Sequence, residues 1–326
     1  MRRHGSMSEG SPAPACSQAA ASIWRLVSKK NDVIIRLNEG DAGLPFYCIH
    51  PLGGDVASYR QFVTALGPHQ RIYGIQATKP VLHSNLTDSI ELLAQHHVNL
   101  LRSFQPHGPL VLAGWSVGAA IALEMARQLQ ALGRPVSLLV ILDGLLANVR
   151  GGIQIWDPRY YWRLLSNLPK WIANDLIEER QNITRRARAR LRAILRIADK
   201  QGKIIPTGHE IDSFVDTTGW LAEQVSFARK LYAANEAYVP RPYDGPVIVY
   251  AAKTQPLFHL LQVEAIWSRV CSAIETVRVE GTHLSFLRQP RVSAVANDLR
   301  SRLEALPAEY GPEHVQSQPQ DGRGAT

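Results

Sequence analysis

The chain alternates between short apolar runs and longer stretches in which apolar residues recur at helical spacing. The runs are near-continuous in Val, Ile and Leu, as expected of strands that are covered on both faces. We predict strands at 33–37, 46–50, 72–76, 110–114, 138–143, 247–251 and 276–279. Helical spacing predicts helices over 56–66, 87–104, 117–132 and 291–305. Strands and helices that alternate in this way favour a mostly parallel sheet with right-handed crossovers.

The alternation stops between about residues 147 and 242. This stretch holds an aromatic cluster, an arginine-rich segment and a helical pattern over 220–237, but no strand-like run. We therefore expect a sheet domain that is interrupted by a helical insertion and flanked by flexible tails, since both ends lack periodicity. The predicted boundaries are 1–30 for the first tail, 31–146 and 243–306 for the sheet domain, 147–242 for the insertion, and 307–326 for the second tail.

The formal net charge of +8 comes from one segment. Residues 180–203 hold nine Lys and Arg residues and a single acid, Asp199, so the rest of the chain is electrically balanced. Within 183–198, apolar residues fall at helical spacing and most arginines lie off that stripe, which predicts an amphipathic helix. Nucleic-acid binding is disfavoured because no recognisable nucleic-acid module accompanies the charge. The arginines of interest are Arg186, Arg188, Arg192 and Arg196.

Cysteine usage and hydropathy restrict the cellular context. Cys16, Cys48 and Cys271 show no pairing pattern, which excludes a disulfide scaffold and suggests a reducing, cytoplasmic location. The longest apolar runs, such as 138–142, are too short to cross a bilayer, so we expect no transmembrane segment. Residues 1–22 contain no continuous hydrophobic stretch, so a secretory signal is not expected.

The strongest chemical signal is the sequence Gly114-Trp115-Ser116-Val117-Gly118. It directly follows a predicted strand and directly precedes a predicted helix, which is the context that a nucleophile elbow requires. In such a turn the serine hydroxyl projects above the sheet, and the helix N-terminus favours developing negative charge. The motif alone is weak, because it also occurs by chance in ordinary turns, but the flanking elements favour Ser116 as a nucleophile.

A serine nucleophile needs a general base, and the base needs an acid that orients it. The expected chain order is serine, acid, histidine. Asp143 lies at the carboxyl end of a predicted strand, where sites on parallel sheets form, although an aspartate there can also cap a turn. His283 follows the last predicted strand, although it can also be a loop histidine that hydrogen-bonds only to backbone. His96 and His97 lie in the middle of a predicted helix, which is a weaker placement for a base.

The negative charge that develops during acyl transfer needs backbone N–H groups beside the serine. One candidate donor is Val117, the residue after the nucleophile. The other is Leu52, because the loop after strand 46–50 contains Gly53 and Gly54 and is therefore able to bend towards the site. A Gly-Gly turn without a role is the alternative interpretation.

Four short sequence motifs occur along the chain in the same order as in a known protein family. They are His50-Pro51-Leu52-Gly53-Gly54, Gly114-Trp115-Ser116-Val117-Gly118, Leu142-Asp143 and Gly281-Thr282-His283. Together they resemble the thioesterase domains of nonribosomal peptide synthetases and polyketide synthases, a branch of the α/β-hydrolases. The similarity covers roughly residues 33–146 and 243–305, with Ala119 standing where the family commonly has a second glycine.

The resemblance implies an α/β-hydrolase fold, in which a mostly parallel central sheet is flanked by helices and residues 147–242 form a lid over an acyl pocket. It implies a triad of Ser116, Asp143 and His283, with Val117 and Leu52 as oxyanion donors. Residues 253–256 contain no carboxylate, which agrees with the family's placement of the acid at Asp143. The acyl chain would arrive on the phosphopantetheine of a carrier protein, so no cofactor of the enzyme's own and no metal is expected.

The predicted function is therefore a serine thioesterase that releases an acyl, peptidyl or polyketide chain by hydrolysis or cyclisation. No carrier, condensation or adenylation motif occurs, so we expect a free-standing enzyme or a terminal domain. Trp115 favours the product-releasing kind over the editing kind. The four arginines would dock an acidic carrier protein or form a solvated lid face, and membrane-surface binding is a less favoured role.

Two alternatives stay open at this point. One is a free-standing esterase or lactonase that acts on small esters. The other is a non-catalytic module that binds an acidic partner through residues 180–203. The oligomeric state is not predicted.

Overall fold

The computed structural model describes residues 33–82, 84–144, 146, 162, 220–254 and 263–307. The first predicted tail, residues 308–326 of the second and most of the predicted insertion lie outside these residues. So do the four candidate docking arginines, Arg186, Arg188, Arg192 and Arg196. The boundaries of the insertion therefore stay a prediction.

In the described part of the chain, seven strands form one sheet in the order β1-β3-β2-β4-β5-β6-β7. Neighbours from β3 to β7 are parallel, and only the edge strand β1 is antiparallel, to β3. The mostly parallel sheet and the place of each predicted strand are confirmed. The strands are β1 (Ile34–Arg36), β2 (Ala42–Ile49), β3 (Gln70–Ile75), β4 (Val111–Trp115), β5 (Leu138–Leu142), β6 (Tyr243–Thr254) and β7 (Cys271–Thr282).

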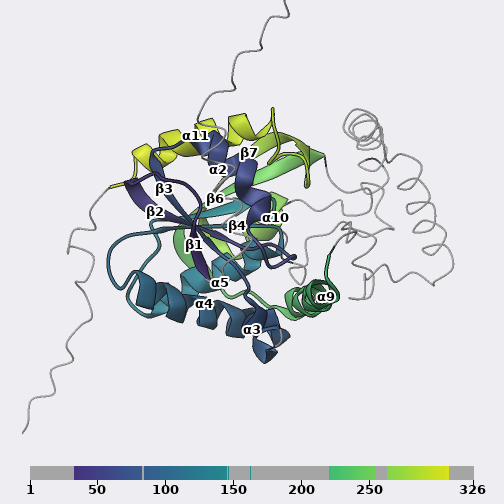
Figure 1. The fold of residues 1–326 in the computed structure, drawn as a ribbon. Helices are drawn as coiled ribbons and strands as arrows, with labels where there is room; N and C mark the ends of the chain where they lie inside the picture. Colours follow the sequence, from purple (N-terminus) through teal and green to yellow (C-terminus); the bar gives the residue numbers. More distant parts are fainter. Residues whose placement is uncertain are drawn as a thin grey trace, which may run out of the picture.

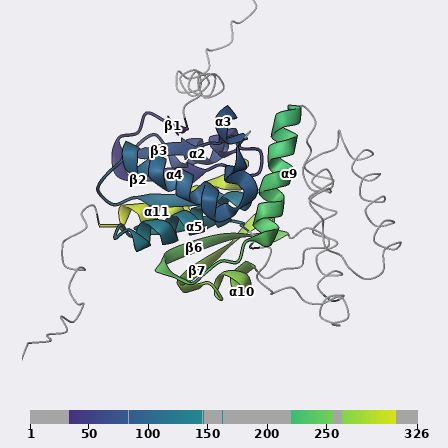
Figure 2. The same cartoon turned by 90° about the horizontal axis from the view of Figure 1, so that it is seen from below.

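Helices cover both faces of this sheet. Figure 1 shows α4 (Ile90–Phe104) and α5 (Val117–Ala131) on one face, with α2 (Arg60–Leu66) and α11 (Val292–Glu304) on the other. Figure 2 shows α9 (Ala222–Ala237) standing along one side of the core, which confirms the helical pattern predicted at 220–237. The shorter elements are the 3-10 helices η1 (Ala57–Tyr59) and η2 (Asn85–Asp88), and the helices α3 (Lys79–Leu82) and α10 (Val263–Trp267).

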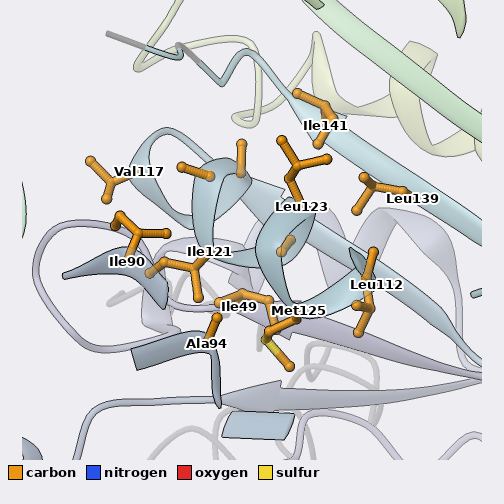
Figure 3. Close-up of a cluster of buried hydrophobic side chains, with 14 of the residues drawn as sticks. Ile49, Ile90, Ala94, Leu112, Val117, Ile121, Leu123, Met125, Leu139 and Ile141 are labelled. Atoms are coloured by element: carbon orange, nitrogen blue, oxygen red, sulfur yellow. The ribbon is translucent and has the colours of Figure 1, made fainter. Parts of the chain in front are cut away.

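The apolar runs are continuous because successive residues of one strand enter two different cores. In β5, Leu139 and Ile141 pack with α4 and α5 (Figure 3), whereas Val140 and Leu142 pack on the side of α2 and α11. Every residue of β5 is buried. Because burying a Leu, Ile or Val side chain contributes about 1.5–3 kcal/mol, both faces of the central strands stabilise the fold.

The helix α5 is more deeply buried than its sequence predicts. The spacing of its apolar residues predicts one buried face, but the structure buries every residue from Val117 to Ala126. Even Glu124 is only 5% exposed. Its carboxylate accepts hydrogen bonds from Arg127 at 2.8 Å and from the hydroxyl of Tyr238, which directly follows α9, at 2.9 Å. The chain after β5 thus returns and covers the outer side of α5.

Within the described ranges, the structure has no helix that is both long and apolar enough to cross a membrane.

Candidate active site

Three of the predicted site residues follow strands of the same parallel sheet. Ser116 directly follows β4, Asp143 directly follows β5, and His283 directly follows β7. The strand ends are in register, because Trp115 pairs with Leu142 across the sheet. Parallel strands place their carboxyl ends at one edge of the sheet, so the three residues lie at the same edge.

Ser116 occupies a strained turn between β4 and α5. Its backbone has φ 57° and ψ −126°, a conformation that residues with a side chain rarely adopt. The turn is possible because no side chain stands at Gly114 or Gly118: a Cβ at Gly114 would lie 2.1 Å from the carbonyl oxygen of Gly118. This is the geometry of the predicted nucleophile elbow.

Asp143 and His283 form a hydrogen-bonded pair that spans β6. The Oδ2 atom of Asp143 lies 2.8 Å from Nδ1 of His283, and its Oδ1 atom accepts a hydrogen bond from the backbone N–H of Ala252 in β6 at 2.8 Å. The carboxylate side chain is only 4% exposed, whereas the imidazole is 24% exposed. A buried acid therefore holds a partly exposed imidazole with its Nδ1 turned inwards, which leaves Nε2 as the atom able to exchange protons.

Trp115, the residue before the serine, holds His283 from a second side. The two rings are stacked with centroids 5.4 Å apart and planes 29° apart. The indole N–H of Trp115 also donates to the backbone carbonyl of His283 at 3.3 Å. The histidine is thus fixed through its ring, its backbone and its Nδ1 atom.

Tyr59 joins β2 and β4 where the two strands separate. Its hydroxyl donates to the carbonyl of Ile49 at 2.7 Å and accepts from the N–H of Trp115 at 2.7 Å. Its side chain is fully buried. The buried hydroxyl therefore has both an acceptor and a donor partner, as buried polar groups require, and it links β2 to β4 beside the elbow.

The predicted oxyanion loop lies against the first turn of α5. A Cβ at Gly118 would lie 2.8 Å from the carbonyl oxygen of His50, so the two backbones are in close contact. Gly54 adopts φ +80°, and a Cβ there would lie 3.0 Å from the ring of Phe227 in α9. Leu52, in the same loop, is buried. The loop with Leu52 and the helix start with Val117 are thus brought together.

The structure therefore places Ser116, Asp143, His283, Val117 and Leu52 at one edge of the sheet. Sequence reasoning missed Tyr59, because nothing in the sequence signals its contacts with Ile49 and Trp115. Among the described residues, no group of three or more His, Cys, Asp or Glu is placed to hold a metal ion.

A mostly parallel sheet flanked by helices, with a serine at a strained strand-to-helix turn, defines the α/β-hydrolase fold. Residues 45–151 match the thioesterase domain family, which confirms the resemblance over the part of the core that carries Ser116 and Asp143.

Curated relatives are found among synthetases and synthases of natural products. The dimodular nonribosomal peptide synthase of Bacillus subtilis is 38% identical over 112 residues, which are 34% of this chain and 5% of that protein. The enterobactin synthase component F of Escherichia coli is 26% identical over 272 residues, 83% of this chain and 18% of that protein. The chain thus spans less than a fifth of the length of either relative.

A solved structure shows the same fold. The NocB thioesterase domain, in covalent complex with a fluorophosphonate nocardicin G analogue, aligns with a TM-score of 0.56 and 23% sequence identity. The alignment covers 83% of this chain and all of that domain. The predicted α/β-hydrolase fold is confirmed.

Proposed function

We propose that this chain is a serine thioesterase that releases an acyl, peptidyl or polyketide chain from a carrier protein through an ester on Ser116. The observation that carries the proposal is the hydrogen bond of 2.8 Å between Oδ2 of Asp143 and Nδ1 of His283. It lies at the sheet edge where Ser116 occupies its strained turn. The match to the thioesterase domain family and the relatives among nonribosomal peptide and polyketide synthases support the choice of a thioester substrate.

The first half-reaction forms the acyl-enzyme. Nδ1–H of His283 donates to Asp143, so the Nε2 lone pair accepts the proton of Ser116 as its oxygen attacks the thioester carbonyl. The N–H groups of Val117 and Leu52 stabilise the oxyanion that forms. The C–S bond then breaks, and His283 returns the proton to the departing thiolate of the phosphopantetheine arm.

The second half-reaction frees the product. Water, or a hydroxyl or amine of the acyl chain itself, attacks the ester carbonyl and gives its proton to His283. The bond between the acyl carbon and the Ser116 oxygen breaks, and Ser116 regains a proton. Attack by water releases an acid, whereas internal attack releases a ring.

The phosphopantetheine belongs to the carrier protein, so the enzyme needs no cofactor of its own in this scheme. We propose residues 147–242 as the lid over the acyl pocket and a cytoplasmic location for the reaction. We further propose that the basic segment 180–203 attracts an acidic carrier, because oppositely charged surfaces accelerate association. The docking residues in this proposal are Arg186, Arg188, Arg192 and Arg196.

The experiment compares kcat/KM for one acyl group on a carrier protein and as a simple ester. We expect the carrier-bound form to be preferred. Changing the four docking arginines to Gln should lower turnover of the carrier-bound substrate, most strongly at low salt, and leave the simple ester unaffected. The matched control removes the same number of charges from four exposed sites of the described chain, with Arg60→Gln, Lys230→Gln, Arg241→Gln and Arg269→Gln.

Other outcomes point to the alternatives. Equal or better turnover of the simple ester would indicate a free-standing esterase or lactonase. A protein that turns over neither substrate, and whose Ser116 does not react with a fluorophosphonate, would be a non-catalytic binding module. Equal loss in the docking variant and its control would mean that the arginines are only a lid surface.

A further inference from the structure

Two buried imidazoles lie next to the predicted oxyanion loop. His50 directly follows β2 and His97 lies in the middle of α4, and both side chains are fully buried. Their Nε2 atoms are 3.3 Å apart, and the rings meet edge to face with centroids 5.4 Å apart. Phe227 of α9 packs on His50 with a centroid distance of 5.8 Å. In this enclosed place, solvent does not replace a lost hydrogen-bond partner.

The contacts of His50 determine where the protons of the pair reside. Its Nδ1 atom lies 2.9 Å from the carbonyl oxygen of Pro51, and a carbonyl oxygen only accepts, so Nδ1 carries the proton. A neutral His50 then has only a lone pair at Nε2. His97 must therefore donate through its own Nε2–H, which leaves a lone pair on its Nδ1 atom. In agreement, Nδ1 of His97 has no hydrogen-bond partner among the described residues.

Both imidazoles are neutral near pH 7, as this arrangement requires. Burial lowers the pKa of His50 to about 4. Burial and the neighbouring histidines His50 and His96 lower the pKa of His97 well below its ordinary value. A neutral imidazole has one donor and one acceptor, so the direction of each hydrogen bond in the pair is defined.

The carbonyl of Pro51 links this pair to the oxyanion loop. It accepts a second hydrogen bond from the N–H of Gly54 at 3.0 Å, so two donors hold it in one direction. The peptide bond to Leu52 is trans, and in a planar trans peptide the N–H points away from the carbonyl. Holding the carbonyl of Pro51 therefore sets the direction of the Leu52 N–H.

We propose that His97 and His50 are positioning residues for the oxyanion hole: the Nε2–H of His97 holds the His50 ring in place, and His50 directs the Leu52 N–H through the Pro51 carbonyl. This inference rests on the proposed function, since it takes Leu52 as an oxyanion donor. Without the donor on His97, the buried Nε2 lone pair of His50 loses its partner, and only the Pro51 carbonyl still holds the ring. The ring is then able to shift, and the Pro51 carbonyl and the Leu52 N–H turn with it.

The test uses three single variants and a fluorophosphonate probe, whose phosphoryl oxygen occupies the oxyanion hole once Ser116 is labelled. His97→Leu removes the donor, His97→Gln keeps an amide N–H, and Gln95→Leu, at an exposed site, is the control in the same helix. Since loss of one oxyanion donor costs about 10²–10³-fold, His97→Leu should slow labelling at least about tenfold. It should lower kcat on a thioester to a similar extent and leave KM unchanged. His97→Gln should restore most of both rates, and Gln95→Leu should have the wild-type rates.

Each result separates the positioning role from the proposed function. Wild-type labelling and kcat in a folded His97→Leu protein would overturn the positioning role and leave the thioesterase proposal intact. Equal losses in His97→Leu and His97→Gln, or a change in KM rather than kcat, would show a packing role and overturn the inference. Absence of Ser116 labelling in the wild-type protein would overturn both proposals.

Discussion

Replacement of Asp143 by Asn tests the acid of the site, because the structure determines how the new amide must orient. The amide oxygen can keep the hydrogen bond from the N–H of Ala252, which Oδ1 of Asp143 now accepts at 2.8 Å. The amide NH₂ then faces Nδ1 of His283, which must become an acceptor. The imidazole proton moves to Nε2, and the lone pair that should deprotonate Ser116 is lost.

The opposite orientation of the amide does not rescue the site. It would place the NH₂ group against the buried N–H of Ala252, and an unsatisfied buried donor costs about 1–3 kcal/mol. The first orientation, with the wrong tautomer of His283, therefore dominates. We expect kcat to fall about 10⁴-fold, since this tautomer error has that effect in serine hydrolases. This factor corresponds to about 5.5 kcal/mol in the activation barrier.

The assay for this prediction is thioester turnover under saturating substrate, together with the fluorophosphonate labelling rate of Ser116. The matched control is Asp298→Asn, because Asp298 is also a hydrogen-bonded carboxylate but serves Tyr250 at 2.7 Å and Arg302 at 2.8 Å. The control should keep the wild-type kcat. If kcat of Asp143→Asn lay within about tenfold of wild type, Asp143 would not be the acid of the site. A tenfold change in kcat corresponds to only about 1.4 kcal/mol in the activation barrier.

Two further predictions concern stability. Ser116→Gly should abolish turnover, but its free energy of unfolding should be about 1 kcal/mol higher than that of Ser116→Ala. Glycine relieves the backbone strain of about 1–3 kcal/mol at φ 57° and loses part of this gain to the entropy of the unfolded chain. Urea unfolding of the two variants measures the difference, and equal stabilities would contradict the prediction. The second prediction is a loss of stability between pH 7 and pH 5. Burial lowers the pKa of His50 from its ordinary 6.5 to about 4, so the unfolded chain binds more protons as the pH falls below 6.5, and His50 alone should cost about 2 kcal/mol. His97→Gln should reduce this loss, because the pKa of His97 is also lowered by burial, whereas the exposed-site control His107→Gln should not.

The central part of the site could be predicted from the sequence because its signals are local. Ser116 lies in a motif whose flanking strand and helix are visible in the apolar pattern, and His283 directly follows the last strand. The chain order of serine, acid and histidine then indicated Asp143. The structure adds how the acid reaches its histidine, since the carboxylate spans β6 and is held there by Ala252.

The supporting contacts could not be predicted because they join residues that are distant in the chain. Tyr59 meets Trp115, and His50 meets His97, only after the sheet has formed. In the sequence, His97 is one polar residue within a helix and gives no signal of its partner. The periodicity of α5 likewise predicts one buried face, because the segment that ends in Tyr238 and covers its outer side lies about a hundred residues further along the chain.

The apolar pattern also predicts the last two strands shorter than they are. The predicted strand 247–251 covers only the middle of β6 (Tyr243–Thr254), and 276–279 covers part of β7 (Cys271–Thr282). Only the middle of β6 is buried on both faces, whereas polar residues and Pro246 interrupt the pattern nearer its start. Backbone pairing between β6 and β7 extends both strands beyond their apolar runs.

The central claim is that an acyl chain passes through an ester on Ser116. Rapid acid quench and intact-mass analysis, after mixing the protein with a panel of acyl-loaded carrier proteins, measures this most directly. We predict that the protein gains the mass of one acyl group, that peptide mapping places it on Ser116, and that Ser116→Ala gains none and does not turn over. Undiminished turnover by Ser116→Ala, or an acyl group on a different residue, would contradict the account.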